Sequence, residues 1–225
     1  MVTKANIIEI FSSIQGEGPY VGQRQAFIRF ADCNLACSYC DVPKNKKAIR
    51  QSCGRIISQI KKLKAQTVSL TGGEPLLQID FLKILLPKLK SLKFMVYLET
   101  NATLPRNLKA ILKYVDIIAA DIKLPSVTKE KGFWKAHSDF IKVGCKKNIF
   151  IKIVVSDKLK MNDFRRGVSL VEKISDKIPL IIQPQTDGKK IKIGINHLRK
   201  LQNYALKHLD TVLVIPQVHK ALGVR

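Results

Sequence analysis

Long apolar runs are missing from this 225-residue chain, and none approaches the roughly 20 residues that span a bilayer. The first ten residues, MVTKANIIEI, include Glu9 and lack a small-residue cleavage site, so no secretory signal is visible. Apolar residues make up 46% of the chain, which is typical of a folded globular protein. We therefore expect one domain over residues 1–225, without a membrane segment, in the cytoplasm.

Acidic residues and tryptophan are also scarce. The 17 Asp and Glu face 40 Lys and Arg, which gives a formal charge of +23, and there is one Trp. Nucleic-acid sites concentrate Arg with aromatic residues, whereas lysines dominate here and are scattered over predicted outer helix faces. A solvated Lys-rich surface is the favoured interpretation. A surface for an acidic electron donor or an anionic substrate is second, and a nucleic-acid site is third.

Cysteine is limited to five residues, an odd number that does not suit a framework of disulfides. Three of them, Cys33, Cys37 and Cys40, lie in one short segment, as metal ligands do in a reducing compartment. Cys53 and Cys145 stand apart, and we expect both to be buried or half-buried thiols without a ligand role.

Short apolar runs alternate with longer amphipathic segments from residue 24 onward. The runs are nearly continuous, as in parallel strands buried on both faces, and the segments between them have helical spacing. Repeated βα units predict an α/β fold with a parallel sheet, either open or curled into a barrel. The predicted strands are Gln25–Ala31, Thr67–Leu70, Phe94–Leu98, Asp116–Ala120, Ile149–Val155, Leu180–Ile182 and Thr211–Ile215. The predicted helices are Ile56–Lys64, Phe81–Leu92, Asn107–Tyr114, Asn162–Ile174 and Ile195–His208.

Polar motifs follow the carboxyl ends of these strands in turn: CNLACSYCD, TGGEP, ETNAT, DIKLPS, QPQT and PQVHK. In parallel α/β folds these ends share one face, so residues far apart in the chain can form one pocket. The segment Pro125–Gly132 combines Pro, Ser, Thr and Gly with charges, which predicts a mobile loop.

The spacing Cys33-x3-Cys37-x2-Cys40 places three thiolates in a loop after a strand, enough for three irons of a [4Fe-4S] cluster. The fourth iron would then be open to chelation by the amino and carboxylate groups of S-adenosylmethionine (SAM), with Tyr39 shielding the cluster edge near the adenine. On spacing alone, a four-thiolate zinc site completed by Cys53 is an alternative.

A second motif, Thr71-Gly72-Gly73-Glu74-Pro75, follows the next strand. Paired glycines allow close approach of a ligand to the backbone, and Glu74 can accept from an ammonium group. With the three-cysteine loop one βα unit earlier, the chain resembles the radical SAM superfamily. That resemblance implies a partial parallel βα barrel of the TIM-like type, with the cluster loop at residues 33–40.

A narrower resemblance rests on EIFSSIQGEG at 9–18, FIRF at 27–30, Cys40-Asp41, ETN at 99–101 and PQVHK at 216–220. Together these motifs resemble the 7-carboxy-7-deazaguanine synthase (QueE) family over nearly the whole chain. The resemblance implies a lyase that converts 6-carboxy-5,6,7,8-tetrahydropterin into 7-carboxy-7-deazaguanine with loss of ammonia, in queuosine and 7-deazapurine biosynthesis. It also implies a homodimer and an acidic flavodoxin- or ferredoxin-like electron donor.

The resemblance assigns residues to the two halves of one pocket and names no catalytic side chain, because the radical comes from SAM. The expected cluster ligands are Cys33, Cys37 and Cys40. The expected SAM contacts are Tyr39, Asp41, Gly73, Glu74, Asp121, Lys123, Gln183, Gln185 and Thr186. The expected substrate contacts are Ile14, Gln15, Gly16, Glu17, Arg29, Thr71, Gln217, His219 and Lys220, with Arg29 on the substrate carboxylate and Glu17 on the guanidine-like edge of the pterin.

Two positions depart from the family pattern. Val42 stands where relatives carry a Thr or Ser that helps to hold Mg²⁺, and a Val side chain cannot coordinate a metal. Mg²⁺ dependence is therefore doubtful, and Lys44 is a candidate for supplying the positive charge instead. Ala102 replaces the usual Gly of ETNGT, which predicts a slightly different turn.

Two alternatives stay open on the sequence. One is another radical SAM enzyme, such as an activator of a glycyl-radical protein, although the SIQGEG and PQVHK motifs favour a small-molecule pocket. The other is a basic four-cysteine zinc module that binds RNA.

Overall fold

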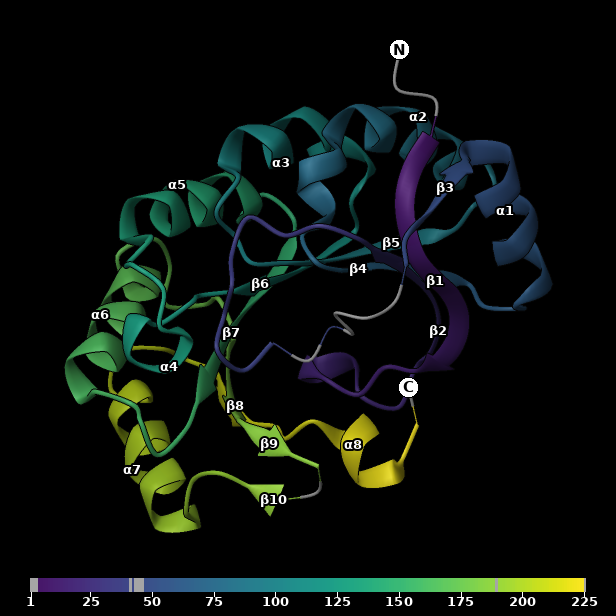
Figure 1. The fold of residues 1–225 in the computed structure, drawn as a ribbon. Coiled ribbons are helices and arrows are strands. Elements are labelled where there is room, and N and C mark those ends of the chain that lie inside the picture. Colours follow the sequence, from purple (N-terminus) through teal and green to yellow (C-terminus); the bar gives the residue numbers. More distant parts are fainter. Residues whose placement is uncertain (1–3, 41, 43–46, 189, 225) are drawn as a thin grey trace.

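The computed structural model describes residues 4–40, 42, 47–188 and 190–224. Its main sheet has nine strands in the order β11-β8-β7-β6-β5-β4-β2-β1-β3, and the sheet curls into part of a barrel with helices outside it (Figure 1). All neighbours from β2 to β11 pair in parallel. These strands are β2 (Arg24–Phe30), β4 (Thr67–Gly72), β5 (Met95–Thr100), β6 (Ile117–Asp121), β7 (Asn148–Val155), β8 (Leu180–Pro184) and β11 (Val212–Val214). The predicted partial βα barrel is confirmed, with every predicted strand in place.

An antiparallel edge was not predicted. Strand β1 (Lys4–Ile14) pairs antiparallel with β2 on one side and with β3 (Ile49–Ser52) on the other. Its Ala5 and Ile7 are buried in the main core, whereas Phe11, which follows a shift in the pairing register between Ile7 and Glu9, is buried on the side of the cavity described below. The long strand carries the chain from the outer rim to the SIQGEG motif, which begins where β1 ends.

Most of the helices cover the convex face of the sheet (Figure 1). Five match predicted segments: α1 (Cys53–Lys62), α2 (Ile79–Ser91), α3 (Pro105–Ile111), α6 (Met161–Glu172) and α7 (Ile195–Ala205). The predicted helix Asn107–Tyr114 also takes in the 3-10 turn η3 (Leu112–Tyr114). The elements that were not predicted are α4 (Pro125–Thr128), α5 (Trp134–Gly144), α8 (Val218–Leu222), the hairpin of β9 (Thr186–Asp187) and β10 (Lys190–Ile191), and the 3-10 turns η1 (Gly18–Tyr20) and η2 (Pro75–Gln78).

The main core lies between the sheet and this helical layer. Leu70, Leu98, Ile118 and Ile151 from successive strands are fully buried there against helix residues such as Leu85. Each such side chain contributes about 1.5–3 kcal/mol relative to full exposure. A smaller apolar cluster that includes Tyr97 and Phe150 lies apart from it, and both of these residues also line the cavity described below.

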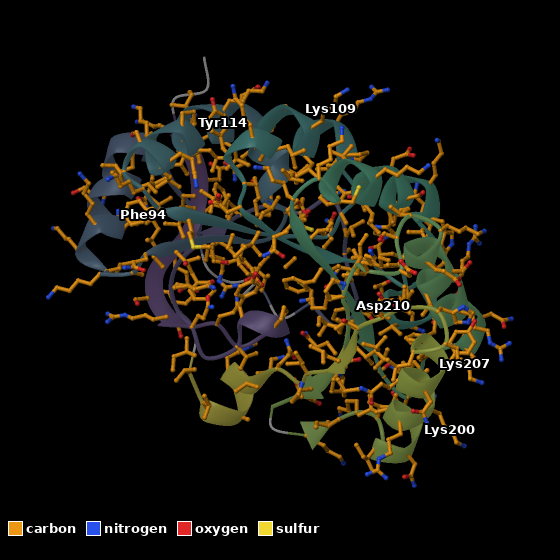
Figure 2. All side chains as sticks on the ribbon, turned by 180° about the vertical axis from the view of Figure 1, so that it is seen from behind. Phe94, Lys109, Tyr114, Lys200, Lys207 and Asp210 are labelled. Atoms are coloured by element: carbon orange, nitrogen blue, oxygen red, sulfur yellow. The ribbon has the colours of Figure 1, made fainter. Side chains whose placement is uncertain are left out.

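Lysines dominate the outer surface. Figure 2 shows Lys109, Lys200 and Lys207 pointing outward from the helical layer, and all three are exposed. Within the described part of the chain, no helix has the length and apolar character needed to cross a membrane. Two lysines, Lys123 and Lys152, break the pattern because their side chains are only 13% and 16% exposed.

Candidate active site

A cavity of about 770 Å³ opens at the carboxyl ends of the parallel strands. It draws its walls from the end of β1, the cysteine loop, the ends of β4 to β8 and the C-terminal segment. The predicted site residues that line it are Ile14, Gln15, Gly16, Glu17, Arg29, Cys33, Cys37, Tyr39, Cys40, Thr71, Gly73, Asp121, Lys123, Gln183, Gln185, Thr186, Gln217, His219 and Lys220. Two predicted residues are not in this set: Glu74 does not line the cavity, and Asp41 lies outside the described residues, as does Lys44.

The cysteine loop is tied to its surroundings on two sides. Asn101, at the end of β5, donates from Nδ2 to the Oδ1 of Asn34 (2.9 Å) and approaches the Sγ of Cys33 (3.8 Å). On the other side, the Ser38 amide donates to the carbonyl of Thr128 and its hydroxyl to that of Val127, both at 2.9 Å. The neighbouring strand end and α4 thus set where the thiols lie.

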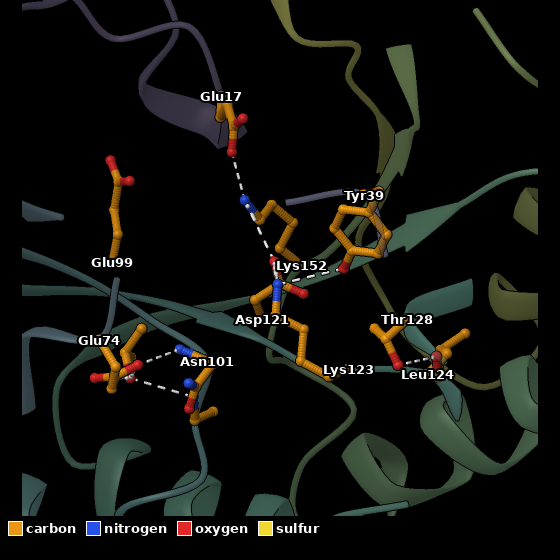
Figure 3. A network of polar contacts seen from close by, with 12 residues as sticks. Glu17, Tyr39, Glu74, Glu99, Asn101, Asp121, Lys123, Leu124, Thr128 and Lys152 are labelled. Atoms are coloured by element: carbon orange, nitrogen blue, oxygen red, sulfur yellow. Dashed lines mark hydrogen bonds and ion pairs between the residues drawn. The ribbon is translucent and has the colours of Figure 1, made fainter. Parts of the chain in front are cut away.

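This anchoring corrects the prediction of a loop over Pro125–Gly132. The first half of that segment is α4, and its Val127 and Thr128 are buried. Thr128 donates from its hydroxyl to the Leu124 carbonyl at 2.9 Å (Figure 3), which closes the short helix on itself. Glu130 beyond it accepts from the Ala36 amide at 2.6 Å, so the segment supports the cysteine loop.

The donor set of this loop fits an iron–sulfur cluster. Cys33, Cys37 and Cys40 all line the cavity, and thiolates are the ligands of such clusters. Among the residues described, no three His, Cys, Asp or Glu side chains are grouped tightly enough for one metal ion. A four-iron cluster sets a different requirement, because each thiolate binds a different iron and the sulfurs stay farther apart. Burial raises the pKa of Cys33, and raises that of Cys37 to about 11, so bound iron is what would make them thiolates.

The two cysteines outside the loop differ from each other. Cys53 is buried at the start of α1 in the hydrophobic core and does not line the cavity, so the zinc site that would have used it as a fourth ligand has no support. Cys145 is exposed, which corrects the expectation of a buried or half-buried thiol. It follows α5 at its C-terminal cap, where the side chain points away from the core.

The paired glycines of TGGEP allow the end of β4 to pack closely against the base of the cysteine loop. A Cβ on Gly73 would lie 1.9 Å from the Asp32 carbonyl oxygen, and one on Gly72 would lie 2.2 Å from that of Phe30. Because of this close approach, the Gly73 amide donates to the Phe30 carbonyl (3.0 Å) and the Glu74 amide to that of Asp32 (2.8 Å). Here the glycines bring two backbone segments together at the base of the loop.

Glu74 was expected to accept from the ammonium group of SAM, and the structure gives it a different place. Its side chain is fully buried. The carboxylate accepts from the Thr100 hydroxyl (3.0 Å), the Asn101 amide (2.8 Å) and the Leu76 amide (3.0 Å), as Figure 3 shows in part. Burial raises its pKa to about 7 against these hydrogen bonds. In this structure Glu74 fixes the end of β5, and through Asn101 the cysteine loop.

Glu99 is a cavity residue that the ETN motif contained but that was given no role. Its carboxylate accepts from Gln15 Nε2 (2.9 Å), the Ser69 hydroxyl (3.1 Å) and the Thr71 hydroxyl (2.7 Å). This cluster joins the end of β1 to β4 and β5. Gln15 and Thr71 therefore reach the cavity wall already oriented by one carboxylate.

A chain of four charged side chains crosses the cavity floor (Figure 3). Lys152 on β7 forms an ion pair with Glu17 and contacts the Asp121 Oδ2 at 3.5 Å. Asp121, at the end of β6, also pairs with Lys123 at 2.8 Å. The Lys123 ammonium lies 5.2 Å from the centre of the Tyr39 ring, close enough for a cation–π contact. Lys152 is not among the predicted site residues, although a lysine inside the apolar run of a predicted buried strand is a signal for such a role.

Glu17, Lys152 and Lys123 are held in their charged forms by their neighbours. Burial on its own would raise the pKa of Glu17, but the Lys152 ammonium and the neighbouring Gln217 and His219 lower it to about 2. Burial also works against the lysine charges, yet carboxylates outweigh it: Glu17 and then Asp121 raise the pKa of Lys152, and Asp121 raises that of Lys123.

Two acceptors in the cavity wall have no donor among the described residues. They are Asp121 Oδ1 and Gln183 Oε1, and both side chains are more than nine-tenths buried. A buried polar atom without a partner costs about 1–3 kcal/mol, so each is suited to a ligand that brings a donor. Ammonium and ribose hydroxyl groups, both present in SAM, are such donors.

The C-terminal segment closes the cavity against the SIQGEG motif. The Val218 amide donates to the Gly16 carbonyl (2.9 Å), and a Cβ on Gly16 would lie 2.4 Å from the His219 ring. Gln217 donates from Nε2 to Glu17 Oε1 at 2.8 Å. The two motifs, predicted to share a substrate pocket, therefore touch each other directly.

Arg29 lies where it can contact a ligand, and it also has a partner within the protein. It lines the cavity, and its Nε donates to Glu9 Oε1 at 3.0 Å while the guanidinium lies 5.5 Å from the centre of the Phe11 ring. The side chain is 21% exposed. Glu9 and Phe11 both belong to β1, so the antiparallel edge sets the direction of Arg29.

His137 and Ala102 support the floor from below. His137 on α5 is fully buried, and its Nε2 accepts from the Lys123 amide at 3.2 Å while its Nδ1 lies 3.2 Å from the Ala102 carbonyl. Burial lowers its pKa to about 4, so the ring is neutral and donates from Nδ1. Ala102 has a φ of 56°, the left-handed conformation that suits the Gly common at this position.

The curled parallel sheet and the three-cysteine loop at its open face define a radical SAM protein, and the Radical SAM superfamily model matches residues 27–156. The chain is 36% identical to the 7-carboxy-7-deazaguanine synthase of Geobacter sulfurreducens over 97% of both chains. It is 38% identical to that of Archaeoglobus fulgidus over 99% of this chain and 100% of the relative. The crystal structure of QueE from Escherichia coli superposes with a TM-score of 0.68 at 18% identity, covering 96% of this chain and 95% of that one. This chain belongs to the 7-carboxy-7-deazaguanine synthase family.

Proposed function

We propose that this enzyme converts 6-carboxy-5,6,7,8-tetrahydropterin into 7-carboxy-7-deazaguanine with release of ammonia. One observation carries the proposal: a single cavity holds the three thiols together with the SIQGEG and PQVHK motifs, which contact each other across it. A concave pocket bounded by these two motifs suits a pterin better than the loop of a protein substrate.

The cofactor half of the cavity is the part nearest the cysteine loop. Cys33, Cys37 and Cys40 would hold a [4Fe-4S] cluster, which together with SAM supplies the radical chemistry of the reaction. Asp121 and Gln183 would accept hydrogen bonds from SAM through their two buried, unpartnered oxygens. Gly73, Tyr39, Lys123, Gln185 and Thr186 would complete this half.

The substrate half lies between β1, β2 and the C-terminal segment. Glu17 is ionised and is directed by Lys152 and Gln217, so it can accept from the N–H groups of the pterin pyrimidine ring. Arg29 would bind the substrate carboxylate, with Glu9 and Phe11 holding its guanidinium in place. Ile14, Gln15, Gly16, Thr71, His219 and Lys220 would supply the remaining contacts.

Val42 lines the same cavity. A hydroxyl at this position would face the bound ligands, whereas the Val side chain offers no oxygen. We therefore propose that Mg²⁺ has a smaller effect on this enzyme than on relatives with Thr or Ser at that position.

Three further features are proposed. An acidic flavodoxin- or ferredoxin-like protein would supply electrons, which the net charge of +23 supports. A cytoplasmic location is supported by free thiols that require a reducing compartment. A homodimer is supported by the family resemblance, and light scattering of the purified protein tests it.

The test of the reaction is anaerobic incubation of the reconstituted protein with SAM, dithionite and carboxytetrahydropterin, followed by mass spectrometry. We expect 7-carboxy-7-deazaguanine and ammonia in equal amounts. SAM cleavage without any change in the pterin would contradict the proposed substrate and favour another radical SAM reaction.

A further inference from the structure

Lys152 lies between the two halves of the cavity and touches both. Its ammonium pairs with Glu17, which belongs to the substrate half, and lies 3.5 Å from Oδ2 of Asp121, which belongs to the cofactor half. The side chain is 16% exposed, and it rises from β7 between the two carboxylates (Figure 3). None of the family motifs that identified the pocket includes this residue.

In each of the two carboxylates around Lys152, the two oxygen atoms have different partners. The Oε2 of Glu17 accepts from Lys152 and its Oε1 accepts from Gln217. The Oδ2 of Asp121 forms ion pairs with Lys152 and Lys123, while its Oδ1 has no donor among the described residues. Lys152 therefore orients both groups, and a ligand that engages Asp121 changes the charge that Lys152 shares with Glu17.

We infer that Lys152 is a positioning residue that couples the two subsites. As a result, SAM binds the enzyme more tightly when the pterin is already bound, and the pterin binds more tightly when SAM is already bound. The inference rests on the proposed function, since it takes the occupants of the two halves from there. Coupling between sites in proteins commonly amounts to about 5- to 150-fold in affinity, and by linkage it is the same in both directions.

Removing the Lys152 charge has a second consequence that concerns Glu17 alone. The charged or polar groups around Glu17 are Lys152 from β7, Asp121 and Lys123 behind it, Gln217 and His219 from the C-terminal segment, and Tyr97 from β5. Burial raises the pKa of Glu17, and Lys152 is the main group that opposes it. Without Lys152 the burial of Glu17 is opposed less strongly, and its pKa must rise.

The experiment compares Lys152→Met with Lys152→Arg in the reconstituted holoenzyme, with SAM and carboxytetrahydropterin as ligands. Lys90→Met is the matched control, because Lys90 also pairs with a partly buried carboxylate, Asp116 at 2.6 Å, but lies outside the cavity lining. The dissociation constant of SAM is measured by anaerobic calorimetry with and without the pterin, and KM and kcat for the pterin are measured from pH 5.5 to 8.

We expect the pterin to tighten SAM binding about tenfold in the unmodified protein, in Lys152→Arg and in Lys90→Met, and less than twofold in Lys152→Met. In Lys152→Met alone, KM for the pterin should rise as the pH drops from 8 to 5.5, because a protonated Glu17 accepts less well from the N–H groups of the pterin. In the unmodified protein KM should not respond to Glu17 over this range.

Equal coupling and a pH-independent KM in Lys152→Met would overturn the inference. If that variant does not fold, the double variant Glu17→Gln with Lys152→Met removes both charges, and it must lack the coupling too. Failure of the unmodified protein to bind or convert the pterin is a different result, which would overturn the proposed function and with it this inference.

Discussion

The closest backbone approach in the site leads to a prediction about Gly73→Ala. The new Cβ would lie 1.9 Å from the Asp32 carbonyl oxygen and 2.5 Å from its carbonyl carbon. Neither atom can rotate away as a flexible side chain would, and Asp32 already has a φ of 68°. The base of the cysteine loop must therefore move away from β4.

The loss of folding stability caused by this movement is the sum of two contributions. Two backbone hydrogen bonds cross the contact, from Gly73 to Phe30 and from Glu74 to Asp32, and each is worth about 0.5–1.5 kcal/mol. Overpacking of a tight site adds about 1–3 kcal/mol. We expect a loss of about 2–6 kcal/mol in the free energy of unfolding, or a displaced loop that keeps the fold and holds less iron.

Denaturant unfolding of the apoprotein and iron and sulfide contents after anaerobic reconstitution measure these two outcomes. Gly54→Ala is the control: Gly54 lies in α1 with nothing within 4 Å of its added Cβ, so this change should stabilise the protein by about 0.5–1 kcal/mol. The reasoning is refuted if Gly73→Ala unfolds at the same denaturant concentration as the unmodified protein and binds as much cluster.

Four more predictions follow from the same site. Replacing any loop cysteine by Ala should abolish both cluster content and SAM cleavage, while Cys53→Ser should leave both intact; loss of metal in Cys53→Ser would revive the four-thiolate alternative. Arg29→Leu should raise the pterin KM about a hundredfold with normal cluster content, on the scale of about 2–5 kcal/mol for a lost buried charge partner; cluster loss without a change in KM would make Arg29 structural. Turnover of the unmodified protein should respond weakly to Mg²⁺ and that of Val42→Thr more strongly, and strong activation of the unmodified protein would refute this. His137 has a pKa of about 4 in the fold against 6.5 unfolded, so its stabilising effect is complete above pH 6.5 and declines as the pH falls toward 4. His137→Gln should therefore cost about 2 kcal/mol less at pH 5 than at pH 7.5 in chemical denaturation, and an equal cost at both would contradict the neutral ring.

The parallel half of the fold could be predicted because it depends on local pattern. Nearly continuous apolar runs such as Ile149–Val155 and the amphipathic segments between them specify buried strands and covering helices without knowledge of their neighbours. The convergence of the polar motifs followed from the same pattern, since parallel strands place their carboxyl ends on one face. The cavity lining confirms that these motifs meet.

What could not be predicted depends on contacts between distant segments. The sequence motif at the end of β1 was recognised, but the pairing of β1 with β2 and β3 was not predicted. This pairing supplies the partners of Arg29, which the spacing of residues in the sequence does not indicate. Glu74 has donors from β5, 26 and 27 residues away, so the sequence did not show that its carboxylate is already satisfied.

Lys152 is a second residue whose partner could not be predicted from the sequence. Its strand was predicted correctly, but Lys152 was given no role among the many lysines of the chain. Its partner Glu17 lies 135 residues away in sequence. The signal that a buried strand cannot hold an unpaired ammonium was present, and naming the partner required the fold.

The central claim is that this cavity converts carboxytetrahydropterin into 7-carboxy-7-deazaguanine, a reaction in which the family resemblance implies that SAM is regenerated rather than consumed. The most direct measurement uses limiting SAM with an excess of carboxytetrahydropterin under reducing, anaerobic conditions, and quantifies 7-carboxy-7-deazaguanine by mass spectrometry. The account predicts more product molecules than SAM molecules supplied, and none from protein that lacks the loop cysteines. A protein that holds its cluster and cleaves SAM but forms no deazaguanine would contradict it.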